Sequence, residues 1–180
     1  MSVFDRQLEI QVRVNKLAGS LALLILLAAC SKSVQQAMPQ EPDSGTACSL
    51  DGMVLKDYPG PKAQIHYAEG APDFFCDLME LFASLLAPEQ KRPVSGIFVQ
   101  DMGKALWENP EGHWIDAKTA VYVAGSRKNG SMGATFGAFA SLQDAEEFVK
   151  KEGGRIVQFE QVTPEMVNLH SGAAHDQKMH

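Results

Sequence analysis

The sequence lacks the short motifs that mark several classes of enzyme. It has no serine nucleophile in a Gly-x-Ser-x-Gly turn and no glycine-rich phosphate-binding motif. It also has no pair of Cys or His doublets at the spacing of a structural zinc site. These absences argue against acyl transfer, nucleotide-dependent chemistry and a zinc ribbon. We therefore predict that the protein is not an enzyme.

The sequence also lacks an apolar run that could cross a bilayer, which takes about 20 residues. The run Leu17–Ala29 has 13 residues and follows a segment with three basic side chains. This pattern is typical of a signal peptide. The run ends in Leu-Ala-Ala-Cys, which resembles the bacterial lipobox. We predict a signal peptide at 1–29 and lipidation of Cys30; the alternative is an ordinary secretory signal followed by a chance cysteine.

Lipidation at Cys30 would attach the chain to the periplasmic face of a bacterial membrane. Ser31 follows the anchor, and in bacterial lipoproteins a serine there favours the outer membrane. Residues 32–46 are rich in Ser, Gln, Pro and Gly and contain few large apolar side chains. We expect 30–46 to be a flexible tether, because such compositions do not bury enough surface to fold.

Charge limits the partners of the mature chain. Removing three basic and two acidic residues with the signal leaves 13 Lys+Arg and 20 Asp+Glu, a formal charge of −7. An acidic protein is a poor ligand for nucleic acid or anionic lipid headgroups. We therefore expect no nucleic-acid partner. The charge does not indicate an oligomeric state.

The rest of the chain has the same order of elements twice. We expect an α+β fold of two ββαβ repeats packed together, because each repeat alone is too small to bury a core. The domain spans 47–162, with units at 47–102 and 118–162. The expected strands are 54–58, 62–68, 94–100, 119–124, 134–140 and 155–161, and the expected helices run from a cap at Asp73 to about Ala87 and from Leu142 to Glu152.

A thiol and a thioether lie close together just after the expected tether. Cys48 and Met53 are separated by a turn that contains Asp51-Gly52. Thiolate and thioether together are the ligands that Cu(I) prefers. The turn should leave the Cys48 thiol accessible for metal transfer.

Several motifs together resemble the NosL family of copper-binding lipoproteins. They are Cys48-x-x-Asp-Gly-Met53, the segment 57–65, Phe75-Cys76-Asp77, Gly130-Ser131-Met132-Gly133 and 153–159. The resemblance covers about 45–161. It implies a fold shared with part of organomercurial lyase, and supply of Cu(I) to nitrous oxide reductase together with a membrane transporter complex. Many family members have a second cysteine where this chain has Asp51, so a site with two thiolates in this loop is excluded.

The resemblance implies a copper site formed by Cys48, Met53 and Met132, with Met132 contributed by the equivalent loop of the second repeat. The C-terminal tail, 163–180, adds possible auxiliary ligands, although chance histidines in a disordered end explain it equally well. These auxiliary ligands are His170, His175, Met179 and His180.

Two alternatives to copper transport remain at this point. A disulfide between Cys48 and Cys76 would make the protein a structural lipoprotein, since disulfides persist outside the cytoplasm. An enzyme related to organomercurial lyase would use Cys48, Cys76 and the Asp51 carboxyl. Cys76 itself is expected in the first helix, mainly as a half-buried small apolar residue. Asp51 is better explained as a turn residue.

Overall fold

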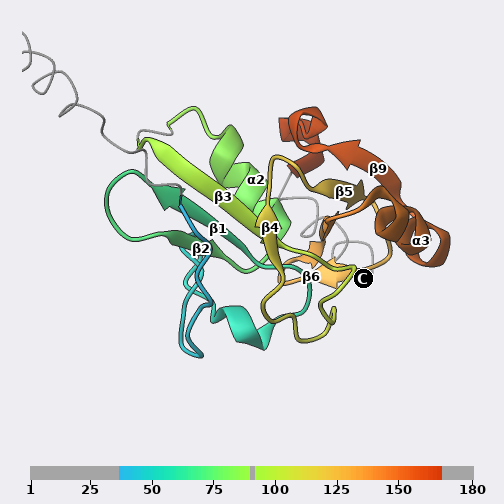
Figure 1. Ribbon diagram of the computed structural model, residues 1–180, viewed down its shortest axis with the longest axis horizontal. Helices are drawn as coiled ribbons and strands as arrows, with labels where there is room; N and C mark the ends of the chain where they lie inside the picture. Colours follow the sequence, from blue (N-terminus) through green and yellow to red (C-terminus); the bar gives the residue numbers. More distant parts are fainter. Residues whose placement is uncertain (1–36, 90–91, 168–180) are drawn as a thin grey trace, which may run out of the picture. The chain divides into compact units, whose positions relative to one another are not determined.

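Among the residues that the structure describes, two α-helices, each preceded by a pair of antiparallel strands, organise the computed structural model (Figure 1). The structure describes residues 37–89 and 92–167. The α+β class and the ββαβ order in each half agree with the sequence-based prediction. The elements of the first unit are β1 (Ala63–Tyr67), β2 (Asp73–Phe75), α2 (Leu78–Leu86) and β3 (Val94–Gln100). Those of the second are β5 (Val121–Ala124), β8 (Gly137–Phe139), α3 (Leu142–Glu152) and β9 (Arg155–Gln158).

The strands form two main antiparallel sheets and a small hairpin. The first sheet has the order β2-β1-β3-β4, in which β4 (Trp114–Asp116) lies at an edge, and the second has the order β8-β5-β9. The hairpin joins β6 (Asn129–Gly130) to β7 (Gly133–Ala134). It contains the motif Gly130-Ser131-Met132-Gly133.

The start of the first helix differs from the prediction. Asp73 lies in β2 rather than at a helix cap, because Phe74 and Phe75 pair with β1. The cap is Asp77, whose Oδ1 accepts hydrogen bonds from the amides of Met79 at 2.9 Å and Glu80 at 3.2 Å. An aspartate in this place satisfies amides that the first helical turn leaves unpaired. The helix predicted from the apolar spacing is present, but it begins at Leu78, because residues 73–75 form β2 instead.

The expected strand 54–58 is wrong, and the last expected strand is shorter than predicted. The segment 54–58 is mainly the 3-10 helix η2 (Leu55–Asp57), with one isolated bridge between Ala47 and Val54. The last strand ends at Gln158 and continues as η3 (Phe159–Gln161), which is followed by η4 (Pro164–Val167). The ββαβ order of the first unit is therefore made by other strands than predicted: β1 takes the first place and β2, expected as part of the helix, takes the second.

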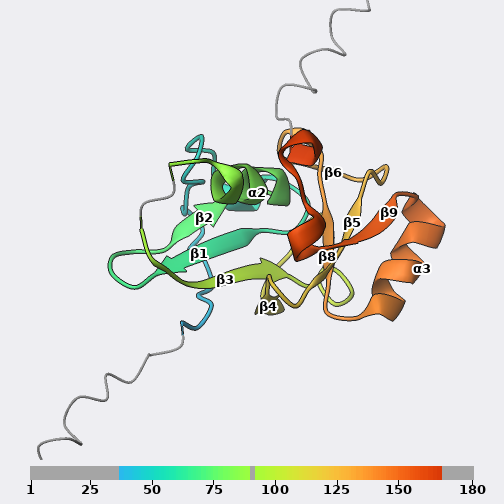
Figure 2. The same cartoon turned by 90° about the horizontal axis from the view of Figure 1, so that it is seen from above.

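The two units pack together through an aromatic core rather than sharing one sheet. Phe82 of α2 lies 5.2 Å, between ring centroids, from both Tyr122 of β5 and Phe136. These three side chains belong to one buried cluster that draws on both units. Figure 2 shows α2 beside β1 and β2, with α3 on the far side of the second sheet. Burying such aromatic side chains supplies a large part of the folding free energy.

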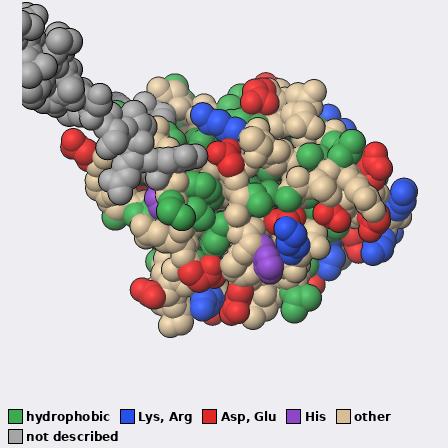
Figure 3. Space-filling model, in the orientation of Figure 1, with side chains coloured by type: hydrophobic (Ala, Val, Ile, Leu, Met, Phe, Trp, Pro, Cys, Tyr) green, Lys and Arg blue, Asp and Glu red, His purple; other side chains and the backbone are tan. Residues whose placement is uncertain are grey.

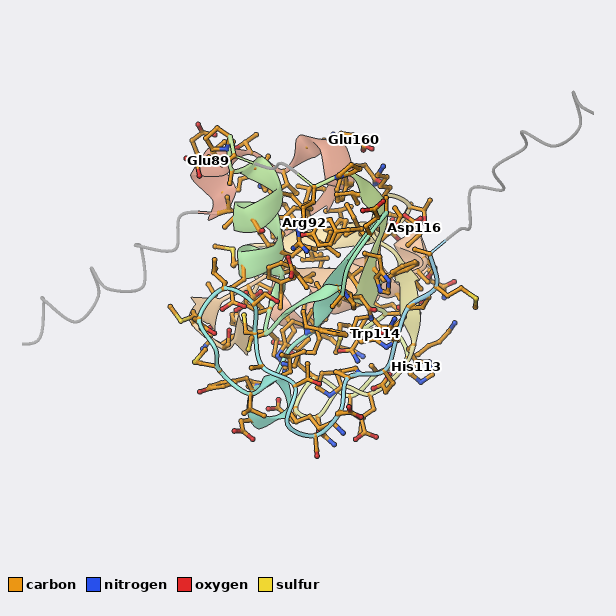
Figure 4. The ribbon with its side chains drawn as sticks, turned by 90° about the vertical axis from the view of Figure 1, so that its left-hand side faces the viewer. Glu89, Arg92, His113, Trp114, Asp116 and Glu160 are labelled. Carbon is orange, nitrogen blue, oxygen red and sulfur yellow. The ribbon has the colours of Figure 1, made fainter. Side chains whose placement is uncertain are left out.

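The segment just before Cys48 is hydrogen-bonded to the first sheet. Gln40 exchanges two backbone bonds with the Gln64 side chain, at 2.8 and 2.9 Å. Glu41 accepts hydrogen bonds from the Trp114 indole at 2.7 Å and from the amide of Gly112 at 3.2 Å. Trp114, the partner of Glu41, is labelled in Figure 4. The expected tether boundary stays a prediction, but residues 40 and 41 contact the domain.

Charged side chains are mixed over the face in Figure 3, where acidic and basic groups alternate without one large patch of either sign. Among residues 37–89 and 92–167, no helix is long and apolar enough to cross a bilayer.

Candidate metal centre

Two thiols that are far apart in the sequence meet at the N-terminus of α2. Cys48 follows the bridge at Ala47, and Cys76 lies between β2 and the helix cap. Glu80 projects from the first turn of α2. The two sulfur atoms and a carboxylate oxygen of Glu80 all lie within 4.8 Å of one another. Hydrogen bonds between Ser49 and Phe74 join the Cys48 turn to β2, and β2 leads directly to Cys76 and the start of the helix.

Glu80 connects both cysteines through a single oxygen. Its Oε2 lies 3.0 Å from the Cys48 sulfur and accepts a hydrogen bond from the Cys76 amide at 2.9 Å. The amide of Leu50 also points at the Cys48 sulfur, at 3.4 Å. Such donors favour negative charge on the sulfur. The Cys48 thiol and the Glu80 carboxyl are thus joined by a direct hydrogen bond.

The surroundings move the pKa values of these groups apart. Hydrogen bonding from the Cys76 thiol lowers the pKa of Cys48 to about 6, against the opposing effect of burial. Burial, followed by the hydrogen bond to Cys48, raises the pKa of Glu80 to about 9. The hydrogen bond to Cys48, followed by burial, raises the pKa of Cys76. The first two shifts favour a negative charge on Cys48 and a neutral carboxyl at Glu80.

The site is closed to solvent, which corrects the expectation of an accessible Cys48. Cys48 is 3% exposed, Cys76 is 0% exposed and Glu80 is 1% exposed. The backbone of the Cys48 turn explains this, because the amide of Ser49 donates to the carbonyl of Phe74 at 2.7 Å. The amide of Phe74 in turn donates to the Ser49 hydroxyl at 3.1 Å. The turn is thus attached to β2 directly above the thiols.

Met53 lies at the side of this cluster. It is half-buried and packs against the small group formed by Cys48, Leu55 and Cys76. The turn brings it back, since the amide of Cys48 donates to the Met53 carbonyl at 2.7 Å. Asp51 acts as a turn residue as expected, with its Oδ1 accepting from the Met53 amide at 3.0 Å. Its carboxylate therefore does not join the three clustered ligand atoms.

Met132 lies at the tip of the β6–β7 hairpin and is 53% exposed. The neighbouring Ser131 hydroxyl donates to Asp77 Oδ2 at 2.9 Å. Asp77 directly follows Cys76 in the chain, so the hairpin reaches the edge of the thiol cluster. The structure thus places the Met132 loop beside the first unit, although the three clustered ligand atoms all come from the first unit.

Cys76 was predicted to be half-buried in the first helix, and this was wrong. It precedes the cap and is fully buried, and both Cys48 and Cys76 are free thiols. The predicted lipidation site, Cys30, and the possible auxiliary ligands of the tail lie outside the described residues. These tail ligands are His170, His175, Met179 and His180.

Sequence reasoning missed Glu80. One signal was available, because Glu80 is the only charged residue in the helix Leu78–Leu86. A carboxylate within an apolar helical stripe must be paired or protonated when it is buried. The four-residue spacing between Cys76 and Glu80 is also the spacing that brings side chains together around a helix start.

Comparison with known proteins first identifies the class of fold. The described domain is similar to the crystal structure of the copper chaperone NosL from Shewanella denitrificans, with a TM-score of 0.68 and 35% identity. That match covers 71% of this chain and 97% of the solved chain.

The family follows from the sequence comparisons. Residues 39–167 match the NosL family. The copper-binding lipoprotein NosL of Stutzerimonas stutzeri is 34% identical over 170 residues, which cover 88% of this chain and 89% of the relative. The copper-binding lipoprotein NosL of Achromobacter cycloclastes is 41% identical over 153 residues, covering 81% and 79%. The chain belongs to the NosL family.

Proposed function

We propose that this protein is a lipid-anchored Cu(I) metallochaperone on the periplasmic face of the membrane. It supplies copper for the assembly of the copper centres of nitrous oxide reductase, with a membrane transporter complex as a further partner. The observation that supports this most directly is the cluster of Cys48, Cys76 and Glu80 within 4.8 Å. The names of its relatives, which bind or deliver copper, support the choice of metal.

The donor set suits Cu(I) as cargo. Two thiolates are strong soft ligands, and the thioether of Met53 beside them is a weak one. Cys76 replaces the second cysteine that the loop lacks at Asp51. Binding at thiols releases protons, and a shared Cys48–Glu80 proton is the first to leave. Met132 adds a sulfur from the second unit.

Delivery requires a ligand that can be exchanged. The buried thiolates hold the ion, whereas an incoming His or Met from the acceptor displaces the weak, more exposed thioethers first. Of the two proposed thioethers, Met132 is the exposed one. The tail ligands proposed from the sequence, His170, His175, Met179 and His180, would act at this step.

The direct test is anaerobic titration of the full-length protein, in detergent and reductant, with Cu(I) against a competing chelator. The parent should bind one Cu(I). Cys48→Ser and Cys76→Ser should each weaken binding at least about a hundredfold, because each replaces a soft thiolate by a hard hydroxyl. The matched control is Ala140→Ser, at the equivalent place before the second helix, which should leave the affinity unchanged. A parent that does not compete above background would contradict the proposal.

Delivery and anchoring need their own measurements. Copper-loaded protein should transfer metal to copper-free nitrous oxide reductase faster than an equal amount of chelated Cu(I), as followed by the reductase's visible spectrum. Cys30→Ala should move the protein from the membrane pellet to the soluble fraction. Equal transfer rates from protein and chelator would argue against a delivery role.

A second candidate function is cleavage of a carbon–mercury bond, favoured by one observation. The carboxyl of Glu80, whose pKa is raised to about 9, lies 3.0 Å from the Cys48 sulfur. With an organomercurial cation on the two thiolates, Glu80 would donate its proton to carbon, the carbon–mercury bond would break, and hydrocarbon and Hg(II) dithiolate would form. Hydrocarbon release from methylmercury, lost in Glu80→Gln, would support it. The same variant should keep most of its Cu(I) affinity if transport is the function.

A further inference from the structure

One buried carboxylate contacts both the thiol cluster and the hairpin of the second unit. Asp77 is 0% exposed. Its Oδ1 caps α2 through the amides of Met79 and Glu80, which fixes the turn that carries the cluster. Its Oδ2 accepts the hydrogen bond of the Ser131 hydroxyl at 2.9 Å. Each oxygen of the group therefore holds a different part of the protein.

The hairpin lies directly on Asp77. A Cβ added to Gly130 would lie 2.8 Å from Asp77 Oδ2 and 2.9 Å from Asp77 Cβ, so only glycine permits this approach. The base of the hairpin is also held, because the Trp107 indole donates to the Asn129 carbonyl at 2.9 Å. The amide of Gly60 donates to the carbonyl of Trp107 at 2.7 Å. These contacts surround the hairpin but leave Met132 at its tip exposed.

We propose that Asp77 and Ser131 are positioning residues that hold Met132 at the same Cu(I) as the two thiols. This inference rests on the proposed function. Ser131 is adjacent to Met132 in the chain, and Asp77 is adjacent to Cys76, so a single hydrogen bond sets the position of one candidate ligand relative to the other.

The physical reason is preorganisation. A two-stranded hairpin with strands of two residues has little stability of its own. Without the bond to Asp77, copper binding would have to order the hairpin, and this cost would be subtracted from the affinity. With the bond in place, the ordering is complete before the metal arrives.

A double-mutant cycle tests this with Cu(I) as the probe. Affinity is measured by chelator competition on the full-length parent, Ser131→Ala, Met132→Leu and the double variant. Loss of the hydroxyl should weaken binding about three- to tenfold in the parent, the range of one hydrogen bond. In the Met132→Leu background the same change should have less than about a twofold effect, because no thioether remains to be positioned.

Two further variants separate positioning from folding. Ser131→Thr keeps the hydroxyl, so this variant should bind Cu(I) as tightly as the parent. Asp77→Ser keeps a side-chain cap for α2 but is too short to reach the hairpin, so it should weaken binding as Ser131→Ala does. Ser95→Ala, on the exposed part of β3, is the matched control and should have no effect.

The outcomes are distinguishable. If the parent binds Cu(I), an effect of Ser131→Ala that is equal in both backgrounds, or no effect at all, would overturn the positioning role. The proposed function would then stay intact. Absence of Cu(I) binding by the parent would overturn both. Coupling confined to the background that contains Met132, with rescue by threonine, is the expected result.

Discussion

The two units begin their helices in the same way, yet within the described residues only the first unit forms a cluster of candidate metal ligands. In the first unit Cys76 precedes the cap Asp77, and Glu80 lies three residues after the cap. In the second unit Ala140 precedes the cap Ser141, and Asp144 lies three residues after it. An acid at the third position interacts with the cap region in many helices.

The difference lies in what faces that acid. Glu80 faces the sulfur of Cys48 at 3.0 Å and is 1% exposed. Asp144 is half-buried, accepts the Ser141 hydroxyl at 2.7 Å and packs against Gly103, where an added Cβ would lie 2.7 Å from its Oδ2. The same backbone thus produces a reactive group or an ordinary cap, according to which chain segment lies over it.

The largest difference between the units should be in core stability. Phe82 of α2 is 2% exposed and contacts aromatic rings of the second unit, whereas Phe148 of α3 is only partly buried beside Phe139. Phe82→Ala should lower the free energy of unfolding by about 3–5 kcal/mol, and Phe148→Ala by less than half of that. Urea unfolding followed by circular dichroism measures both. Equal losses would show that the two helices contribute equally to the core.

The second difference should be a pH dependence specific to Glu80. Its pKa is raised from 4.5 to about 9 in the folded protein, so the folded state binds more protons than the unfolded state over that interval. This contribution to stability is complete below pH 4.5 and is lost as pH rises towards 9. Between pH 4.5 and 6, copper-free Glu80→Gln should therefore gain stability relative to the parent, by at most about 1.4 kcal/mol per pH unit.

Above pH 6 the thiol of Cys48 acts in the opposite direction. Its pKa is lowered from 9.0 to about 6, so its ionisation stabilises the folded state as pH rises from 6 to 9. The measurement is urea unfolding of reduced protein at pH 4, 5 and 6, with Asp144→Asn as the matched control. A parent and a Glu80→Gln variant that differ by a constant amount over this range would refute a buried, protonated Glu80.

The predictions from sequence succeeded where local rules suffice. The helix Leu142–Glu152 and the strand Val94–Gln100 have the bounds that periodicity and capping indicated. The thiol cluster was not predictable in this way, because Cys48 reaches Cys76 through hydrogen bonds between Ser49 and Phe74 of β2, a strand that is itself placed by its pairing with β1. That pairing is a tertiary interaction, and it also converted the expected cap at Asp73 into a strand residue. Glu80 could have been suspected as the lone charge of an apolar helix, but its contact with Cys48 depends on the same tertiary packing.

The smallest effect should come from the cap of the second unit. The Ser141 hydroxyl accepts from the Asp144 amide at 3.1 Å and donates to the Asp144 carboxylate at 2.7 Å. Ser141→Ala removes both bonds and should lower the free energy of unfolding by about 1 kcal/mol, whereas Ser141→Thr should lower it by less. Neither change should alter Cu(I) affinity, because the hydrogen bonds of Ser141 go to Asp144 and not to a candidate ligand. A weakened affinity in Ser141→Ala, measured beside its urea midpoint, would mean that the second helix reaches the metal centre through its sheet.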